Sequence, residues 1–212
     1  DPNESSSVLT IDTPALGKSG DVRVGVDSST QFGLTLTYMA KANLGIELLA
    51  ATPFDHDIHG AGTLAGVGKI ADSKQLPPTL TFSYYPNETS AKFQPYIGLG
   101  LNYTTFFDSG VTPVLDNAGT FDTLATLAGA DPDTITSVSN TDIELDDSFG
   151  LAFHAGFDYQ FTDNIGINAA YWKIDIDTTA EVTTTSNIGQ LKASVDVNVD
   201  PSVYMVGLSY KF

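Results

Sequence analysis

Cysteine is absent from this chain of 212 residues. Without thiols the protein has no disulfide framework, no thiolate metal site and no cysteine nucleophile. Basic side chains are also scarce, since nine Lys and Arg stand against 26 Asp and Glu and the formal net charge is −17. A surface of that sign repels the phosphates of nucleic acids, so we expect no nucleic-acid partner.

Long apolar runs are missing as well. Hydrophobic residues make up 42% of the chain, but no run approaches the roughly 20 apolar residues that a membrane helix requires. The other structure that satisfies every backbone polar group inside a membrane is a closed β-barrel. Asp1 opens a polar stretch instead of a basic and then apolar leader; if the protein is exported, we expect its leader to have been removed.

The hydrophobic pattern has a period of two, which predicts strands. Apolar residues alternate with polar or small ones within 31–38, 93–107 and 149–161, and aromatic residues crowd both ends of the third segment. Rings at both ends of an apolar band are typical of strands that end at the two membrane interfaces. We therefore predict an all-β fold, a transmembrane antiparallel up-and-down β-barrel.

The connections between these strands alternate in length. Short, turn-forming connections lie at 41–43, 87–92 and 162–164, and long polar excursions lie at 55–73, 109–141 and 178–190. Outer-membrane barrels have short periplasmic turns and long external loops, so we place the excursions outside the cell. The predicted strand segments are 21–40, 44–56, 74–85, 93–107, 142–161, 165–179 and 191–212, all within one domain, 1–212.

The last segment places large apolar residues at every even position from Tyr204 and ends in Tyr210 and Phe212. A final strand with an aromatic terminal residue resembles the signal that the outer-membrane assembly machinery reads. We expect that machinery and outer-membrane lipid to be partners of the protein.

Several stretches resemble the OmpW family, and they occur in the family's order. They are TQFGLTLTYMA (30–40), LGIELLAATPF (44–54), LPPT (76–79), FQPYIGLGLNYTTFFD (93–108), YWKIDIDTT (171–179) and YKF (210–212). The resemblance covers nearly the whole chain apart from the long loops. It implies a bacterial outer-membrane barrel that passively transports small hydrophobic molecules through a narrow apolar lumen, with lateral exit into the membrane.

The resemblance includes one departure. The family barrel has eight strands, whereas 1–20 resembles the first external loop and only seven strand segments follow it. Bacterial single-chain barrels have even strand numbers, so we expect a first strand to precede Asp1. The segment 109–141 corresponds to an unusually long external loop.

Parity assigns two apolar side chains, Leu49 and Trp172, to the interior. On residue type alone, ordinary interior packing is the better reading, because eight-stranded barrels are commonly filled by side chains. The resemblance instead implies a hydrophobic constriction, or gate, formed by these two residues. Pro78 and Pro95 fall within apparent strands and each removes a ladder donor, which makes them candidates for the lateral opening.

Metal and cofactor sites are not indicated. His56 and His59 lie near Asp55 and Asp57, but two histidines three residues apart on an extended loop do not converge. We therefore expect adventitious metal binding or none, and no cofactor. His154 is interpreted as a polar lumen residue. One acidic cluster and one acidic pair are read as solvated strand extensions, not cation sites: Asp142, Glu144, Asp146 and Asp147, and Asp175 and Asp177.

Three other classes of protein compete with the channel. A lipase or protease inside a barrel needs a nucleophile, a base and an orienting group, and His154 with its nearby serines forms no recognisable set, so we do not expect an enzyme. The second alternative is a closed structural, adhesive or receptor barrel that acts through its loops, and the sequence does not exclude it. A soluble lipocalin-like barrel has the same alternation, but the glycine-rich second face and the terminal Phe212 favour lipid outside.

Overall fold

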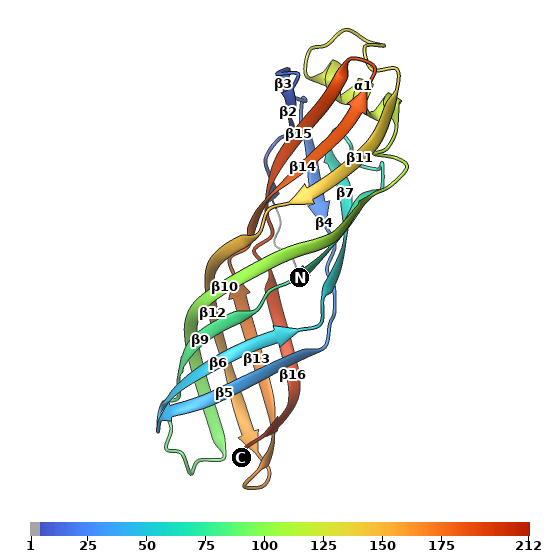
Figure 1. Ribbon diagram of the computed structural model, residues 1–212. Helices are drawn as coiled ribbons and strands as arrows, with labels where there is room; N and C mark the ends of the chain where they lie inside the picture. Colours follow the sequence, from blue (N-terminus) through green and yellow to red (C-terminus); the bar gives the residue numbers. More distant parts are fainter. Residues whose placement is uncertain (1–4) are drawn as a thin grey trace.

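The computed structural model describes residues 5–212, which form mainly antiparallel strands (Figure 1). In chain order the elements are β1 (Ser5–Ser6), β2 (Thr10–Thr13), β3 (Gly17–Lys18), β4 (Val22–Val26), β5 (Gly33–Lys41), β6 (Leu44–Ala51), β7 (Phe54–Gly62), β8 (Lys69–Leu76), β9 (Thr79–Tyr84), β10 (Phe93–Val111), α1 (Ala118–Leu127), β11 (Val138–Leu145), β12 (Ser148–Gln160), β13 (Ile165–Ile174), β14 (Asp177–Ser186), β15 (Gly189–Asn198) and β16 (Ser202–Tyr210). Within these residues no helix is long and apolar enough to cross a membrane.

Seven strands form a curved, tilted wall that we call the lower barrel (Figure 1). Their order is β5, β6, β9, β10, β12, β13 and β16, and each is antiparallel to its neighbour. Among residues 5–212, β5 has a ladder only with β6, and β16 has one only with β13. The predicted up-and-down order of these strands is confirmed.

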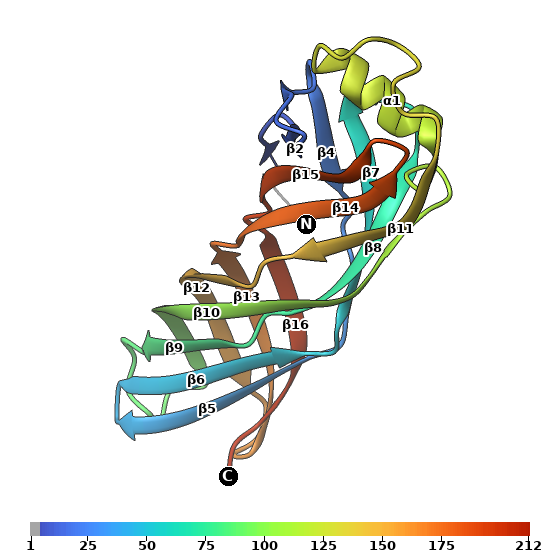
Figure 2. The same cartoon turned by 45° about the horizontal axis from the view of Figure 1, so that its top comes forward.

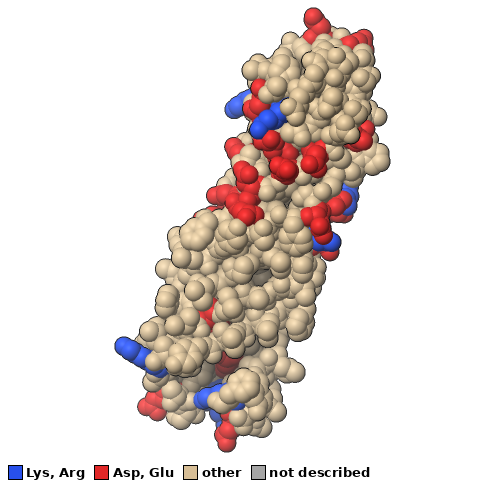
Figure 3. Space-filling view, in the orientation of Figure 1, with Lys and Arg blue, Asp and Glu red and all other residues tan. Residues whose placement is uncertain are grey.

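The outer face of the lower barrel is apolar, as the alternation predicts. Leu36 is 64% exposed and Val206 is 82% exposed, and on β12 the exposed Phe153 lies between the fully buried Ala152 and His154. Few charged side chains lie on this flank in the view of Figure 3, and acidic groups gather above it. A broad exposed apolar band between charged ends is what a strand wall in hydrocarbon requires.

Above the lower barrel the strands continue as a second unit, the upper extension. One sheet holds β11, β14, β15, β2 and β3, with β1 also paired to β15. Facing it are β4, β7, β8 and the last part of β10 (Figure 2). The expectation of loops at 55–73 and 178–190 is therefore wrong, because these segments form the hairpins β7–β8 and β14–β15.

The other expected loops also contain regular structure. Segment 1–20 includes β1, β2 and β3 within its described part, and 109–141 includes α1 and the start of β11. Asn117 caps α1, since its Oδ1 accepts the Gly119 N–H at 2.8 Å. Phe121, Leu124 and Ala125 turn one apolar side of the helix into the protein. The helix lies across the far end of the extension (Figure 2).

We predict that Leu99→Arg, on the lipid-facing side of β10, lowers the free energy of unfolding by about 2–4 kcal/mol, because it places a charge in hydrocarbon. Urea unfolding in lipid vesicles measures this. The control Glu144→Arg changes an exposed residue of the upper extension and should shift stability by less than about 0.5 kcal/mol. Equal, small effects of both substitutions would contradict a hydrocarbon environment around β10.

Candidate binding cavity and its polar floor

The two sheets of the upper extension enclose an apolar cavity of about 950 Å³, part of it open to solvent. Strands β4, β11, β14 and β15 contribute alternate aliphatic side chains, because a strand turns every second residue to the same face. The aliphatic lining comprises Leu9, Val22, Val24, Val26, Ile58, Leu64, Val67, Ile70, Leu115, Leu124, Ile143, Leu145, Ala180, Val182, Val195, Val197 and Val199. Such a space accepts an apolar solute and offers little to a charged one.

The lower end of this cavity carries a few polar groups that satisfy one another. His56 Nδ1 lies 2.7 Å from the carbonyl oxygen of Asp27, which can only accept, so Nδ1 carries the proton. His56 Nε2 accepts from Gln75 Nε2 at 2.9 Å. Burial lowers the pKa of His56, so the ring is neutral at neutral pH. The cavity wall therefore holds polar groups without a charge.

Below the cavity, the lower barrel is filled by polar side chains that we call the polar floor. It is centred on His154, whose side chain is fully buried. The hydroxyl oxygens of Thr81 and Ser83 lie 3.1 Å from His154 Nε2. Glu47 Oε1 is 3.5 Å from His154 Nδ1. The predicted reading of His154 as a polar lumen residue agrees with this position, but its contact with Glu47, 107 residues away in the chain, was not foreseen.

Aromatic rings complete the floor. Trp172 stacks on His154 with 4.0 Å between ring centroids and 18° between planes, and Tyr96 packs against the same imidazole at 5.4 Å. Asn168 Nδ2 donates to the Tyr96 hydroxyl at 2.7 Å and to Asp158 Oδ1 at 3.0 Å. An apolar solute entering this region would separate hydrogen-bonded groups, at about 1–3 kcal/mol for each buried group left unpaired. The floor is therefore a barrier along the barrel axis.

Because Gly98 on β10 has no side chain, it leaves room for the His154 ring. A Cβ atom at residue 98 would lie 1.9 Å from His154 Nε2, well inside van der Waals contact. The two residues are ladder partners between β10 and β12. The imidazole therefore lies across the place where any other side chain at position 98 would project.

The barrel wall is interrupted beside the lower end of the cavity. The β6–β9 ladder ends at the pair Leu49 and Thr79, and the β7–β8 ladder starts at Phe54 and Gln75. Residues 50–53 and 76–78 between these rungs lie in neither ladder, and 77–78 are both proline. Gln75 also lines the cavity. We call this interruption the wall break.

The residues expected at the gate lie outside the lining of the cavity. Leu49 and Trp172 both point inward and are buried, as parity predicts, but neither lines the apolar cavity. Leu49 belongs to the last rung below the wall break, and Trp172 belongs to the polar floor. A common constriction formed by these two side chains stays a prediction.

The two expected prolines also differ. Pro78 borders the wall break, and its carbonyl accepts the Tyr103 N–H at 3.1 Å on the opposite side. Pro95 lies within the β10–β12 ladder, whose register is unbroken from Phe93 to Thr104. The missing donor of Pro95 thus leaves no interruption there, and Pro78 is the better candidate for an opening.

The remaining sequence-predicted residues lie outside the cavity. Tyr210 closes β16 opposite Ile165, and Phe212 follows the strand with its side chain exposed, which leaves their role as an assembly signal a prediction. His56 and His59 lie on β7, not on a loop, and they face opposite sides as their spacing in an extended chain requires. Helix α1 was not predicted, although the spacing of Phe121, Leu124 and Ala125 is that of one apolar helix face.

Comparisons with known proteins agree with this architecture. The model of the OmpW family matches residues 1–126 and 128–212. Outer membrane protein W of Vibrio cholerae serotype O1 is 42% identical over 190 residues, covering 89% of this chain and 76% of that protein. The crystal structure of outer membrane protein OprG from Pseudomonas aeruginosa superposes with a TM-score of 0.83 at 44% identity, covering 100% of this chain and 90% of that one. The solution structure of Escherichia coli outer membrane protein W gives a TM-score of 0.54 at 36% identity, over 99% and 96% of the two chains.

We predict that Gly98→Ala lowers the free energy of unfolding by about 1–3 kcal/mol, because the new methyl group overpacks the floor at His154. The matched control is Gly207→Ala on β16, where a Cβ meets nothing within 4 Å; it should change stability by less than about 0.5 kcal/mol. In a His154→Ala background the cost of Gly98→Ala should largely vanish. A cost that persists there would show that His154 is not the cause.

Proposed function

Because the chain belongs to the OmpW family of outer-membrane proteins, we propose that it is a channel for the passive transport of small hydrophobic molecules across the outer membrane. The observation that carries the proposal is the aliphatic cavity of the upper extension, which ends beside the wall break. No chemical step is involved, and the protein acts by partitioning, not as an enzyme.

The cavity sets the class of solute. Burial of apolar surface contributes roughly 25 cal/mol for each Å² removed from water, so a small hydrocarbon-like molecule gains by leaving water for the valine-rich walls. The net charge of −17 adds a second filter, because a negative surface repels anionic molecules before they reach the cavity. Neutral apolar solutes are therefore preferred over fatty acids or other anions of similar size.

The polar floor directs the solute sideways. Movement down the barrel axis meets the buried hydrogen bonds around His154 and Asn102. Movement through the wall break meets no ladder to separate. Leu49, at the last rung below the break, gives the exit an apolar lower edge. We therefore assign lateral exit into the membrane to 50–53 and 76–78.

The family's count of eight strands forms part of this proposal. Among residues 5–212 one edge of β5 and one edge of β16 have no ladder, and an eighth strand between them would close the lower barrel. Closure on this side would leave the wall break as the lateral route in the described wall.

The cavity can be tested by placing a charge in it. Val182→Asp should lower the rate at which proteoliposomes take up a labelled neutral apolar solute by about tenfold, because an unpaired carboxylate in an apolar space disfavours such a solute. The milder Val182→Thr, which keeps the shape of the side chain, should give a smaller loss in the same direction. Uptake is followed by fluorescence after mixing.

The matched control is Thr185→Asp, which adds the same charge to the exposed face of β14 and should leave uptake unchanged. Heat-dependent mobility on gels verifies folding of each variant. If liposomes with the unmodified protein took up solute no faster than empty ones, the transport proposal would fail, and a structural or adhesive barrel would replace it.

The lateral route can be tested by repairing the wall. Pro77→Ala with Pro78→Ala supplies two backbone N–H donors that proline lacks, so the strands can pair across the break. We expect transfer of an apolar solute into the lipid phase to slow by about threefold or more. Pro95→Ala, in the unbroken ladder, is the control and should leave transfer unchanged. Slowing by the control alone, or by neither, contradicts exit at the break.

A further inference from the structure

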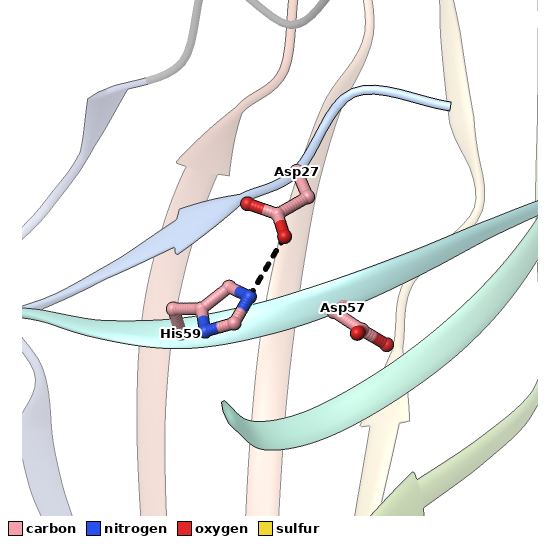
Figure 4. Close-up of side chains that lie close together, drawn as sticks. All are labelled: Asp27, Asp57 and His59. Atoms are coloured by element: carbon pink, nitrogen blue, oxygen red, sulfur yellow. Dashed lines mark hydrogen bonds and ion pairs between the residues drawn. The ribbon is translucent and has the colours of Figure 1, made fainter. Parts of the chain in front are cut away.

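A cluster of metal-ligating side chains lies outside the cavity, on the outer face of the upper extension (Figure 4). Asp57 and His59 are two residues apart on β7 and therefore point to the same side. Asp27 follows β4 directly, and its N–H bonds the Asp57 carbonyl at 3.2 Å, which places the two aspartates side by side across the ladder. One ligand atom from each of the three residues lies within 4.8 Å of the others.

The charges around this cluster are unbalanced. Asp57 is also the ladder partner of Asp72 on β8, so three carboxylates form a row across β4, β7 and β8. Like charges directly opposite one another destabilise a sheet. The row has one lysine, Lys69, which bridges Asp57 at 2.7 Å and Asp72 at 3.0 Å. Asp27 has instead the imidazole of His59, with Nε2 and Oδ2 2.9 Å apart.

We propose that Asp27, Asp57 and His59 form a binding site for a transition-metal dication such as Zn²⁺. Zinc takes imidazole nitrogen and carboxylate oxygen at about 2.0–2.2 Å, which places neighbouring ligand atoms about 3.3 Å apart. The Asp27–His59 pair, now 2.9 Å apart, reaches this spacing by opening slightly. Asp57 reaches it by a small side-chain rotation that releases Lys69, and Lys69 keeps Asp72 as its partner.

The donor set selects the class of ion. Calcium and magnesium prefer oxygen ligands throughout, whereas one imidazole with two carboxylates suits zinc and its transition-metal neighbours. All three side chains are partly or largely exposed, so the remaining coordination positions face solvent. The ion would join the end of β4 to β7 at the last rung before 28–31, whose residues lie in no ladder.

Zinc titration of the full chain in detergent micelles tests the site. The protein must lack a histidine tag, since a tag would bind the probe. We expect one Zn²⁺ per chain by calorimetry, and a shift of the His59 ring signals in nitrogen-resolved NMR with those of the buried His154 unmoved. His59→Ala, Asp27→Asn and Asp57→Asn should each weaken zinc binding by about tenfold or more, because each removes a ligand.

The control variant is Asp108→Asn, which removes one carboxylate paired to Lys74 on the same outer face and should keep zinc affinity within about twofold. Unmoved His59 signals would overturn the site, as would full zinc affinity in His59→Ala. The site would also be overturned if calcium bound as tightly as zinc and His59→Ala left that binding unchanged. Such a result would show that cations only screen the charges of the carboxylate row. If His59→Ala fails to fold, the NMR result on the unmodified chain and Asp57→Asn decide the question. None of these measurements depends on transport.

Discussion

Hydrocarbon offers no partner to a backbone N–H or C=O group, and this constraint shapes the whole lower barrel. Each strand must find its hydrogen bonds in the next strand, which explains the continuous ladders from β6 to β16. It also explains why an interruption is informative. At the wall break the segments 50–53 and 76–78 do not pair with each other, and two consecutive prolines remove donors on one side.

At the level of the wall break the interior of the molecule changes from apolar to polar. Above it, alternate valines, isoleucines and leucines line an empty space, and below it, hydroxyl, amide, imidazole and carboxyl groups fill the barrel. A molecule that prefers the first environment is disfavoured by the second. In the proposed transport route the apolar cavity, the polar floor and the wall break act together, because the direction of exit depends on all three.

Much of this architecture could be predicted from the sequence, because a period of two is a local property. The alternation around Leu36 and Val206 gave the lipid face, and parity placed Leu49, Trp172 and His154 inside. Most of β14 was missed because its outward positions carry Thr and Glu, so that it looks like a polar loop although Val182 points inward. The polar composition of this segment concealed its alternation between inward apolar and outward polar residues.

Contacts between distant segments could not be predicted in the same way. The approach of Glu47 to His154, the fit of that ring against Gly98 and the meeting of Asp27 with His59 all depend on register between strands. Register is decided by turn geometry and by the packing of the whole wall. The expectation that His56 and His59 do not converge held, yet the partner that does meet His59 comes from another strand.

Strand β10 runs for 19 residues, about 60 Å at roughly 3.3 Å per residue. With the usual tilt of about 40° it rises nearly 50 Å, whereas the hydrocarbon layer is about 30 Å thick. If the upper extension faces outward, as the connection lengths predict, the upper part of the wall stands beyond the hydrocarbon, in the headgroup layer. In the proposed channel an apolar molecule would then be out of water while it still passes the polar headgroup layer.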